Sequence, residues 1–233
     1  MTLLTFFGCA LTAYGPPLAI FFLTVAKDAQ LVILMVSSAF FWLISILIAS
    51  SIWFVSKSKD PITVLYSVLL QELFRWFFFK LLSRAEKGLI LASANPTSPF
   101  NRSTFAFVSG LGFGFMNGLV TYINPLVSSV GSGVIMCKSC PTLTSFFIGA
   151  ITTCLSILLH ITWMVLAFEG FIYPKRKYYY IIWVVLSHLG ASYSTLFNQS
   201  EIKFGCVIGI LINIAMLGVS IIASVMALKK VNK

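Results

Sequence analysis

Apolar residues occur in seven long blocks along this chain, and short segments that carry most of its charges separate the blocks. A helix needs about 20 mostly apolar residues to cross the hydrocarbon core of a bilayer, and each block reaches about that length. The pattern therefore predicts an all-α membrane protein, a bundle of seven transmembrane helices. The predicted spans are residues 3–26, 31–55, 62–82, 103–124, 143–168, 178–197 and 204–228.

The overall composition agrees with this pattern. Hydrophobic residues make up 59% of the chain and charged residues only 9%, whereas soluble domains are typically about 45–50% apolar and about 25% charged. No polar stretch is longer than roughly 20 residues, which is too short for a separate soluble domain. We therefore expect a single polytopic membrane domain that covers residues 1–233.

The net charge of +10 does not indicate nucleic-acid binding, because the basic residues form no basic stripe. They lie between the apolar blocks, and their positions indicate the topology of the chain in the membrane. With the N-terminus outside, eleven Lys and Arg residues fall on the inner side and four on the outer side. This bias predicts a lumenal or extracellular N-terminus and a cytosolic C-terminus. The four outer residues are Lys57, Lys59, Lys138 and Lys203.

Two of the five cysteines, Cys137 and Cys140, lie in the predicted outer loop, where disulfides persist. They form either a local disulfide or two free thiols. No further ligands stand nearby in the sequence, so we expect no metal there. Cys9, Cys154 and Cys206 lie in predicted spans, where they are expected to pack as small apolar residues.

Glycines recur every four residues in the fourth span, at Gly110, Gly114 and Gly118. Such a row lets two helix backbones approach closely. Asn117 lies almost on the same stripe and can add a hydrogen bond between helices. The pattern predicts close helix packing, against either another helix of this chain or another protein.

Ionisable and polar residues also occur inside three spans. Gln71, Glu72 and Arg75 lie in the third span, and His160 and His188 in the fifth and sixth. At about 1.5 Å of rise per residue, the four ionisable groups lie roughly 10–15 Å from the inner ends of their spans. We therefore expect them to share one polar cavity. Helix-to-helix packing, a catalytic or metal site and a pocket for a partner segment all remain possible, and we favour packing without chemistry.

Several other classes of membrane protein fit the sequence less well. The receptor motifs Asp-Arg-Tyr and Asn-Pro-x-x-Tyr are absent, as are a Lys in the last span and a Gly-x-Ser-Gly loop. A small-molecule transporter remains an alternative, although no internal repeat is visible. The main rival is an intramembrane protease of the prenyl-processing glutamate or metal type, whose paired glutamates are reduced here to Glu72.

Short motifs follow one another in a fixed order along the chain. They are Phe-Phe-Gly-Cys at 6–9, Gly-Pro at 15–16, Ala-Phe-Phe-Trp-Leu at 39–43, Val-Leu-Leu-Gln-Glu-Leu-Phe-Arg at 68–75, Lys-Leu-Leu at 80–82, the glycine row at 110–118, Leu-Leu-His at 158–160 and Ser-His-Leu at 187–189. Together these motifs resemble the anterior-pharynx-defective family of γ-secretase subunits, of which this chain looks like a divergent member. The family's outer segment before the third span is shortened here to residues 56–61, and Cys137 and Cys140 are not typical of it.

The resemblance implies a non-catalytic scaffold with no cofactor. It implies assembly with presenilin, nicastrin and the presenilin-enhancer subunit in the endoplasmic reticulum, Golgi and plasma membrane. It further implies that Gly110, Gly114 and Gly118 support assembly, and that His160 and His188 line a polar cavity near presenilin.

Overall fold

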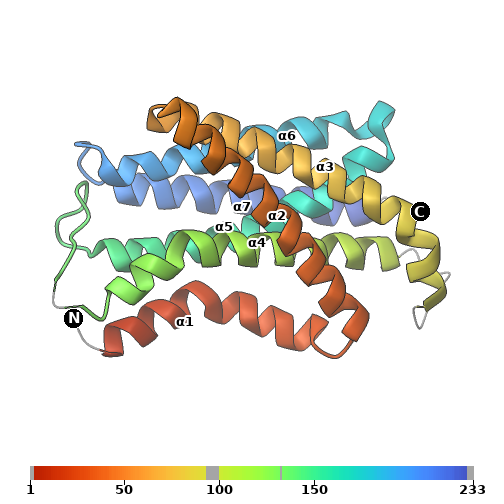
Figure 1. Cartoon of the computed structure of the whole chain (residues 1–233), viewed down its shortest axis with the longest axis horizontal. Helices are drawn as coiled ribbons and strands as arrows, with labels where there is room; N and C mark the ends of the chain where they lie inside the picture. The colour runs from red at the N-terminus through yellow and green to blue at the C-terminus, as the bar shows by residue number, and fades with distance from the viewer. Residues whose placement is uncertain (1–2, 93–99, 132, 230–233) are drawn as a thin grey trace.

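The computed structural model describes residues 3–92, 100–131 and 133–229. Within this part of the chain, seven α-helices form one bundle, and α2 crosses it obliquely (Figure 1). A π-helical turn, η1 (Phe21–Val25), prolongs α1, and a 3₁₀ turn, η2 (Thr195–Gln199), prolongs α6. The helices are α1 (Leu3–Ile20), α2 (Ala29–Ser56), α3 (Asp60–Ala92), α4 (Phe100–Ser128), α5 (Ser145–Ile172), α6 (Pro174–Ser194) and α7 (Gly205–Lys229).

Seven helical segments of 23 to 28 residues are long and apolar enough to cross a membrane, and those of α1 and α6 include the η1 and η2 turns. The prediction of seven spans is therefore confirmed, and the chain is a multi-pass membrane protein. The largest difference in boundaries is at α3, which continues to Ala92 although the apolar span was expected to end at residue 82. The added turns are rich in Ala, Leu, Arg, Glu and Lys, which favour helix without needing lipid around them.

Local signals fix several helix ends. Asp28 caps α2, because its side chain accepts a hydrogen bond of 2.9 Å from the backbone N–H of Gln30. Thr144 caps α5 in the same way, through the N–H of Phe147. Lys57 ends α2 in a left-handed conformation with a φ of 48°. The two ends of α2 therefore set the short turns that reverse the chain from α1 to α2 and from α2 to α3.

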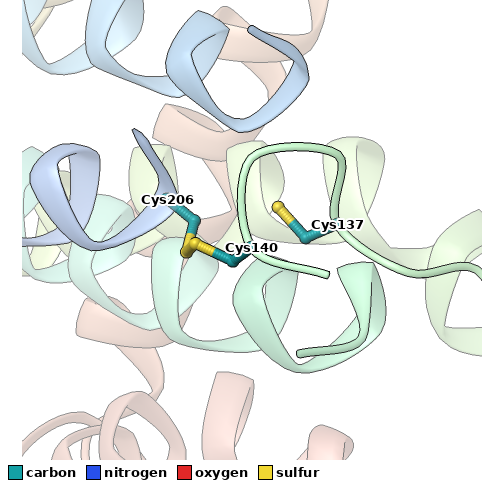
Figure 2. A group of neighbouring side chains, drawn as sticks. All are labelled: Cys137, Cys140 and Cys206. Carbon is teal, nitrogen blue, oxygen red and sulfur yellow. A yellow bond between two sulfur atoms is a disulfide. The ribbon is translucent and has the colours of Figure 1, made fainter. Parts of the chain in front are cut away.

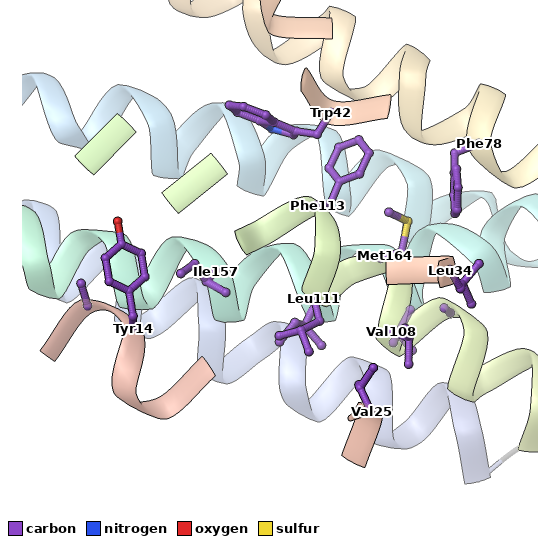
Figure 3. Packing of buried hydrophobic residues seen from close by; sticks show 14 of the residues in the cluster. Tyr14, Val25, Leu34, Trp42, Phe78, Val108, Leu111, Phe113, Ile157 and Met164 are labelled. Carbon is purple, nitrogen blue, oxygen red and sulfur yellow. The ribbon is translucent and has the colours of Figure 1, made fainter. Parts of the chain in front are cut away.

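Helix α5 lies at the centre of the bundle and contacts α1, α3, α4, α6 and α7. Every residue from Leu159 to Gly170 is buried, as expected for a helix that is covered by protein on all sides. Figure 3 shows the main apolar cluster, in which Phe113 and Leu111 of α4 and Ile157 and Met164 of α5 lie close together. Trp42 of α2 closes one side of this cluster.

The predicted glycine row packs inside the chain, against α5. A Cβ atom added to Gly110 would lie 2.7 Å from Ile161 Cα, and one added to Gly114 would lie 2.7 Å from Ile157 O. Backbone meets backbone at both positions, so neither has room for a side chain. At Gly118 an added Cβ would first meet a flexible side-chain end, Ile157 Cδ1, at 2.8 Å. The sequence left open which helix packs against the glycine row. Among the described residues, that helix is α5.

The opposite face of α4 approaches α2 just as closely. A Cβ atom on Gly112 would lie 2.1 Å from the carbonyl oxygen of Met35. Beside it, the Ser38 hydroxyl donates a 2.7 Å hydrogen bond to the carbonyl oxygen of Ser109. Gly112 lies outside the four-residue row, and the sequence analysis did not identify it. Helix α4 is thus held closely on two faces.

We predict that the stability of the bundle follows the contacts of each glycine. Gly114→Ala should destabilise it by about 1–3 kcal/mol, because the methyl group forces two backbones apart. Gly118→Ala should cost less, since Ile157 can change rotamer. The matched control is Gly218→Ala, where nothing lies within 4 Å of the added atom. Thermal unfolding in detergent measures all three variants, and equal losses at Gly114 and Gly218 would contradict the packing described.

Candidate functional site

Four ionisable side chains from three helices form a continuous chain of contacts in the bundle. Glu72 and Arg75 lie one turn apart on α3, with Arg75 Nε 3.1 Å from Glu72 Oε2. The other carboxylate oxygen, Oε1, lies 2.6 Å from His188 Nδ1 on α6. Arg75 Nη2 lies 3.2 Å from His160 Nδ1 on α5. The expected meeting of these four residues is therefore present, in the order His188, Glu72, Arg75, His160.

The contacts determine where the histidine protons lie. A guanidinium group only donates hydrogen bonds, so Nδ1 of His160 must accept and its proton resides on Nε2. A carboxylate only accepts, so Nδ1 of His188 carries a proton and donates it to Glu72. The 3.1 Å contact between Arg75 Nε and Glu72 Oε2 is an ion pair. It lacks the geometry of a hydrogen bond, and Arg75 Nε has no hydrogen-bond partner among the described residues. Both oxygens of Glu72 therefore have partners within the protein.

Aromatic rings enclose this chain of charges. The rings of His160 and His188 meet edge to face at 5.1 Å, and Trp163 stacks on His188 at 4.5 Å. Phe113 presents its face to the guanidinium of Arg75 at 5.2 Å, a favourable cation–π arrangement. Arg75 has no exposed surface at all. A buried cation of this kind is tolerated only when paired.

The fifth predicted polar residue of this region, Gln71, has a separate role. Its Oε1 accepts a 2.9 Å hydrogen bond from Trp42 Nε1, which ties α3 to α2. Asn117 donates to the Ser156 hydroxyl at 2.7 Å and ties α4 to α5. Both side chains also border a cavity. The sequence placed both residues inside predicted spans but could not show their individual partners.

The cavity has a volume of about 770 Å³ and lies between α2, α3, α4, α5, α6 and α7. His160 and His188 form part of its wall halfway along the helices, and Ser145 and Asn198 border it at the end of the bundle where the chain begins. Trp163 Nε1 has no hydrogen-bond partner among the described residues and lies in this wall. Asn213, which donates to Ser194 at 2.7 Å, also lines the cavity and was not identified from the sequence.

The structure corrects the cysteine assignment. Cys140 is joined to Cys206, 66 residues away, and not to Cys137, which keeps a free thiol (Figure 2). Cys206 was expected to pack as an apolar residue inside the last span. Helix α7 begins only at Gly205, so Cys206 lies in its first turn, level with the loop that carries Cys140. The nearby charge of Lys203 marks this boundary in the sequence and could have indicated it.

Among the described residues, seven apolar helices form a bundle, and six of them border a cavity that polar side chains help to line. The charges of the Glu72–Arg75 pair are matched inside the bundle. These features define a helical multi-pass membrane protein with a structured polar interior. Comparison with known proteins narrows this class. The sequence profile of the family described as "Aph-1 protein" matches residues 4–230. The chain belongs to the Aph-1 family, which confirms the resemblance seen in its motifs.

Individual relatives agree over most of the chain. "Gamma-secretase subunit Aph-1b" of Danio rerio is 38% identical over 210 residues, which cover 85% of this chain and 80% of the relative. "Gamma-secretase subunit Aph-1" of Drosophila melanogaster is 39% identical over 206 residues, covering 87% and 84%. "Gamma-secretase subunit APH1-like" of Arabidopsis thaliana is 31% identical over 222 residues, covering 90% and 87%.

We predict that removing the negative charge of Glu72 destabilises the bundle strongly. Glu72→Gln leaves Arg75 as a buried cation without a counter-charge, at a cost of about 3–5 kcal/mol. The exposed pair of Lys138 and Glu201, 3.1 Å apart, supplies the matched control, and Glu201→Gln should cost at most about 1 kcal/mol. Thermal unfolding in detergent compares the two.

The double variant Glu72→Gln/Arg75→Gln should recover much of this lost stability, because it removes both charges together. If Glu72→Gln unfolds at the same temperature as Glu201→Gln, Arg75 is not held by Glu72 as described.

Proposed function

We propose that this chain is a non-catalytic scaffold subunit of γ-secretase, the intramembrane aspartyl protease complex. Its partners in this proposal are presenilin, nicastrin and the presenilin-enhancer subunit. The complex cleaves type I membrane proteins such as Notch and the amyloid precursor protein. The observation that carries the proposal is the family membership over residues 4–230, together with relatives that are named as subunits of that complex.

The distribution of acidic residues supports a non-catalytic role. Aspartyl proteolysis needs two carboxyl groups close enough to share one proton. This chain has two aspartates, Asp28 and Asp60. Asp28 caps the start of α2 and Asp60 begins α3, so they lie at opposite ends of the bundle (Figure 1). Neither can approach the other or a peptide bond in the membrane interior.

The same reasoning disfavours the rival glutamate or metal protease. Glu72 is the acidic residue among the four contacting ionisable side chains, and its two carboxylate oxygens contact Arg75 and His188. Catalytic zinc sites normally use three protein ligands and an open position, with a separate base to activate water. Nδ1 of His160 already accepts from Arg75. The group favours mutual neutralisation and rigid packing over chemistry.

A scaffold role also agrees with how the glycine row is used. Gly110 and Gly114 lie against the backbone of α5. In this proposal they support assembly by shaping this chain, and they do not touch a partner directly. The contacts of α5 with five other helices tie the chain into one domain. A rigid bundle of this kind can present fixed outer helix faces to neighbouring membrane subunits.

The orientation in this proposal has a lumenal N-terminus and a cytosolic C-terminus, in the endoplasmic reticulum, Golgi and plasma membrane. The helices alternate in direction, so Lys27 and Lys175 lie at the same end of the bundle as Lys229 (Figure 1). Lys57 and Lys138 lie at the opposite end. This arrangement supports the proposed orientation, because cytosolic loops carry the excess of basic residues in membrane proteins.

Affinity purification of the tagged chain in mild detergent, followed by mass spectrometry, tests the proposal. We expect recovery of presenilin and nicastrin, and no peptidase activity in the chain purified alone. In the same membranes, sealed with the lumenal face inward, a tag after Lys233 should be open to protease, as the cytosolic C-terminus requires. Peptidase activity in the isolated chain, or its recovery without those partners, would refute the scaffold.

A further inference from the structure

Three cysteines from two distant parts of the chain meet (Figure 2), at the end of the bundle where the N-terminus lies (Figure 1). Cys137 and Cys140 belong to the α4–α5 loop (residues 129–144), and Cys206 belongs to the first turn of α7. Their sulfur atoms all lie within 4.8 Å of one another, and all three residues are buried. The free thiol of Cys137 is therefore next to the disulfide between Cys140 and Cys206.

We propose that these residues form a thiol–disulfide exchange site, in which Cys137 displaces Cys206 from Cys140. The Cys137 thiolate attacks Cys140 Sγ, so that a bond between Cys137 and Cys140 forms as the bond between Cys140 and Cys206 breaks. The electron pair of the broken bond remains on Cys206 Sγ, which takes up the proton that Cys137 released. One disulfide and one thiol exist before and after, so no oxidant or reductant is consumed.

The loop is already shaped for the product of this exchange. The N–H of Cys140 donates a 3.2 Å hydrogen bond to the carbonyl oxygen of Cys137, which closes a four-residue turn. Such a turn brings its first and last Cα atoms within about 7 Å, and disulfides join Cα atoms about 4.4–6.8 Å apart. In this proposal the resting form of the protein has the disulfide between Cys140 and Cys206. The form produced by exchange has the disulfide between Cys137 and Cys140.

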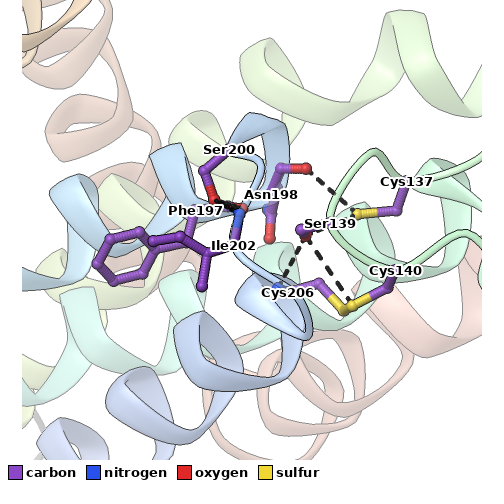
Figure 4. Close-up of a disulfide and its surroundings, with 8 residues drawn as sticks. All are labelled: Cys137, Ser139, Cys140, Phe197, Asn198, Ser200, Ile202 and Cys206. Carbon is purple, nitrogen blue, oxygen red and sulfur yellow. Dashed lines mark hydrogen bonds between the residues drawn. A yellow bond between two sulfur atoms is a disulfide. The ribbon is translucent and has the colours of Figure 1, made fainter.

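Hydrogen bonds hold the Cys137 thiol within the cluster. Its sulfur lies 3.4 Å from the carbonyl oxygen of Asn198 and 3.5 Å from the Ser139 hydroxyl (Figure 4). The Ser139 hydroxyl in turn accepts a 3.0 Å hydrogen bond from the N–H of Cys206. Ser139 therefore contacts both the attacking residue and the leaving residue, and it keeps them in place as the bond changes partner.

Exchange would change what holds the loop to α7. The disulfide is the covalent link between them, and hydrogen bonds such as that from Phe204 N–H to Ser139 O, at 3.0 Å, supply the rest. Ser145, which follows the loop, and Asn198, which precedes α7, both border the cavity. The exchange site therefore controls a covalent tether at the end of the cavity nearest the N-terminus.

Disulfide mapping of the full-length chain in detergent tests the proposal. Protein kept in acid, where thiolates are scarce, is brought to about pH 8 for set times and quenched with acid. It is then denatured, alkylated with a maleimide and analysed by mass spectrometry after digestion. We expect a growing fraction with Cys137 bonded to Cys140 and with Cys206 alkylated.

Two variants keep the test decisive. Cys137→Ser should lose the new linkage entirely and retain the bond from Cys140 to Cys206 at all times, which also reports correct folding. Cys206→Ser should close the bond between Cys137 and Cys140 when treated with oxidised glutathione. The proposal is overturned if the wild-type linkage never changes, if Cys137 bonds only to Cys206, or if Cys206 is alkylated equally in Cys137→Ser.

Discussion

The close backbone contact between α4 and α5 is the constraint on which the rest of the structure depends. Because Gly110 and Gly114 have no Cβ atoms, the two backbones meet at positions 157–161. This contact fixes the height of His160 on α5 and of Phe113 on α4. Those two rings lie 5.9 Å apart, and both face Arg75 of α3. A steric property of two glycines thus determines where the buried cation can be held.

The buried charges then fix α3 and α6 relative to α5. Arg75 is fully buried, and leaving a charge unpaired in such a place costs several kcal/mol in proteins. It is paired with Glu72, which binds His188 of α6, while His160 of α5 contacts the guanidinium. Three helices are therefore held in one register by directional contacts. In a membrane, where lipid and apolar side chains are alike in polarity, such contacts supply specificity that apolar packing lacks.

Those features that depend on composition and on spacing within one helix were predictable from sequence. Seven spans followed from the apolar blocks, and the close approach of α4 followed from the four-residue spacing of Gly110, Gly114 and Gly118. The convergence of Glu72, Arg75, His160 and His188 followed from their depth along the helices. These quantities need only the rise of a helix and the thickness of a bilayer.

Features that depend on pairing between distant segments could not be predicted in this way. Cys206 pairs with Cys140 across 66 residues, and no spacing rule indicates that choice. Gly112 contacts α2 because α4 is covered on two faces, which requires knowing the neighbours of α4. The extension of α3 to Ala92 lies outside the apolar block and therefore outside the signal used to find spans.

The central claim is that the four contacting ionisable residues, His188, Glu72, Arg75 and His160, maintain the shape of a scaffold and supply no reacting group. The most direct test is proteolytic activity per assembled complex, with wild-type chain and with Glu72→Gln/Arg75→Gln, normalised to the amount of complex recovered. The account predicts equal turnover per complex, even if less complex assembles. Loss of a general acid or base typically lowers turnover by about 10²–10⁴-fold, and a loss of that order in fully assembled complex would contradict the account.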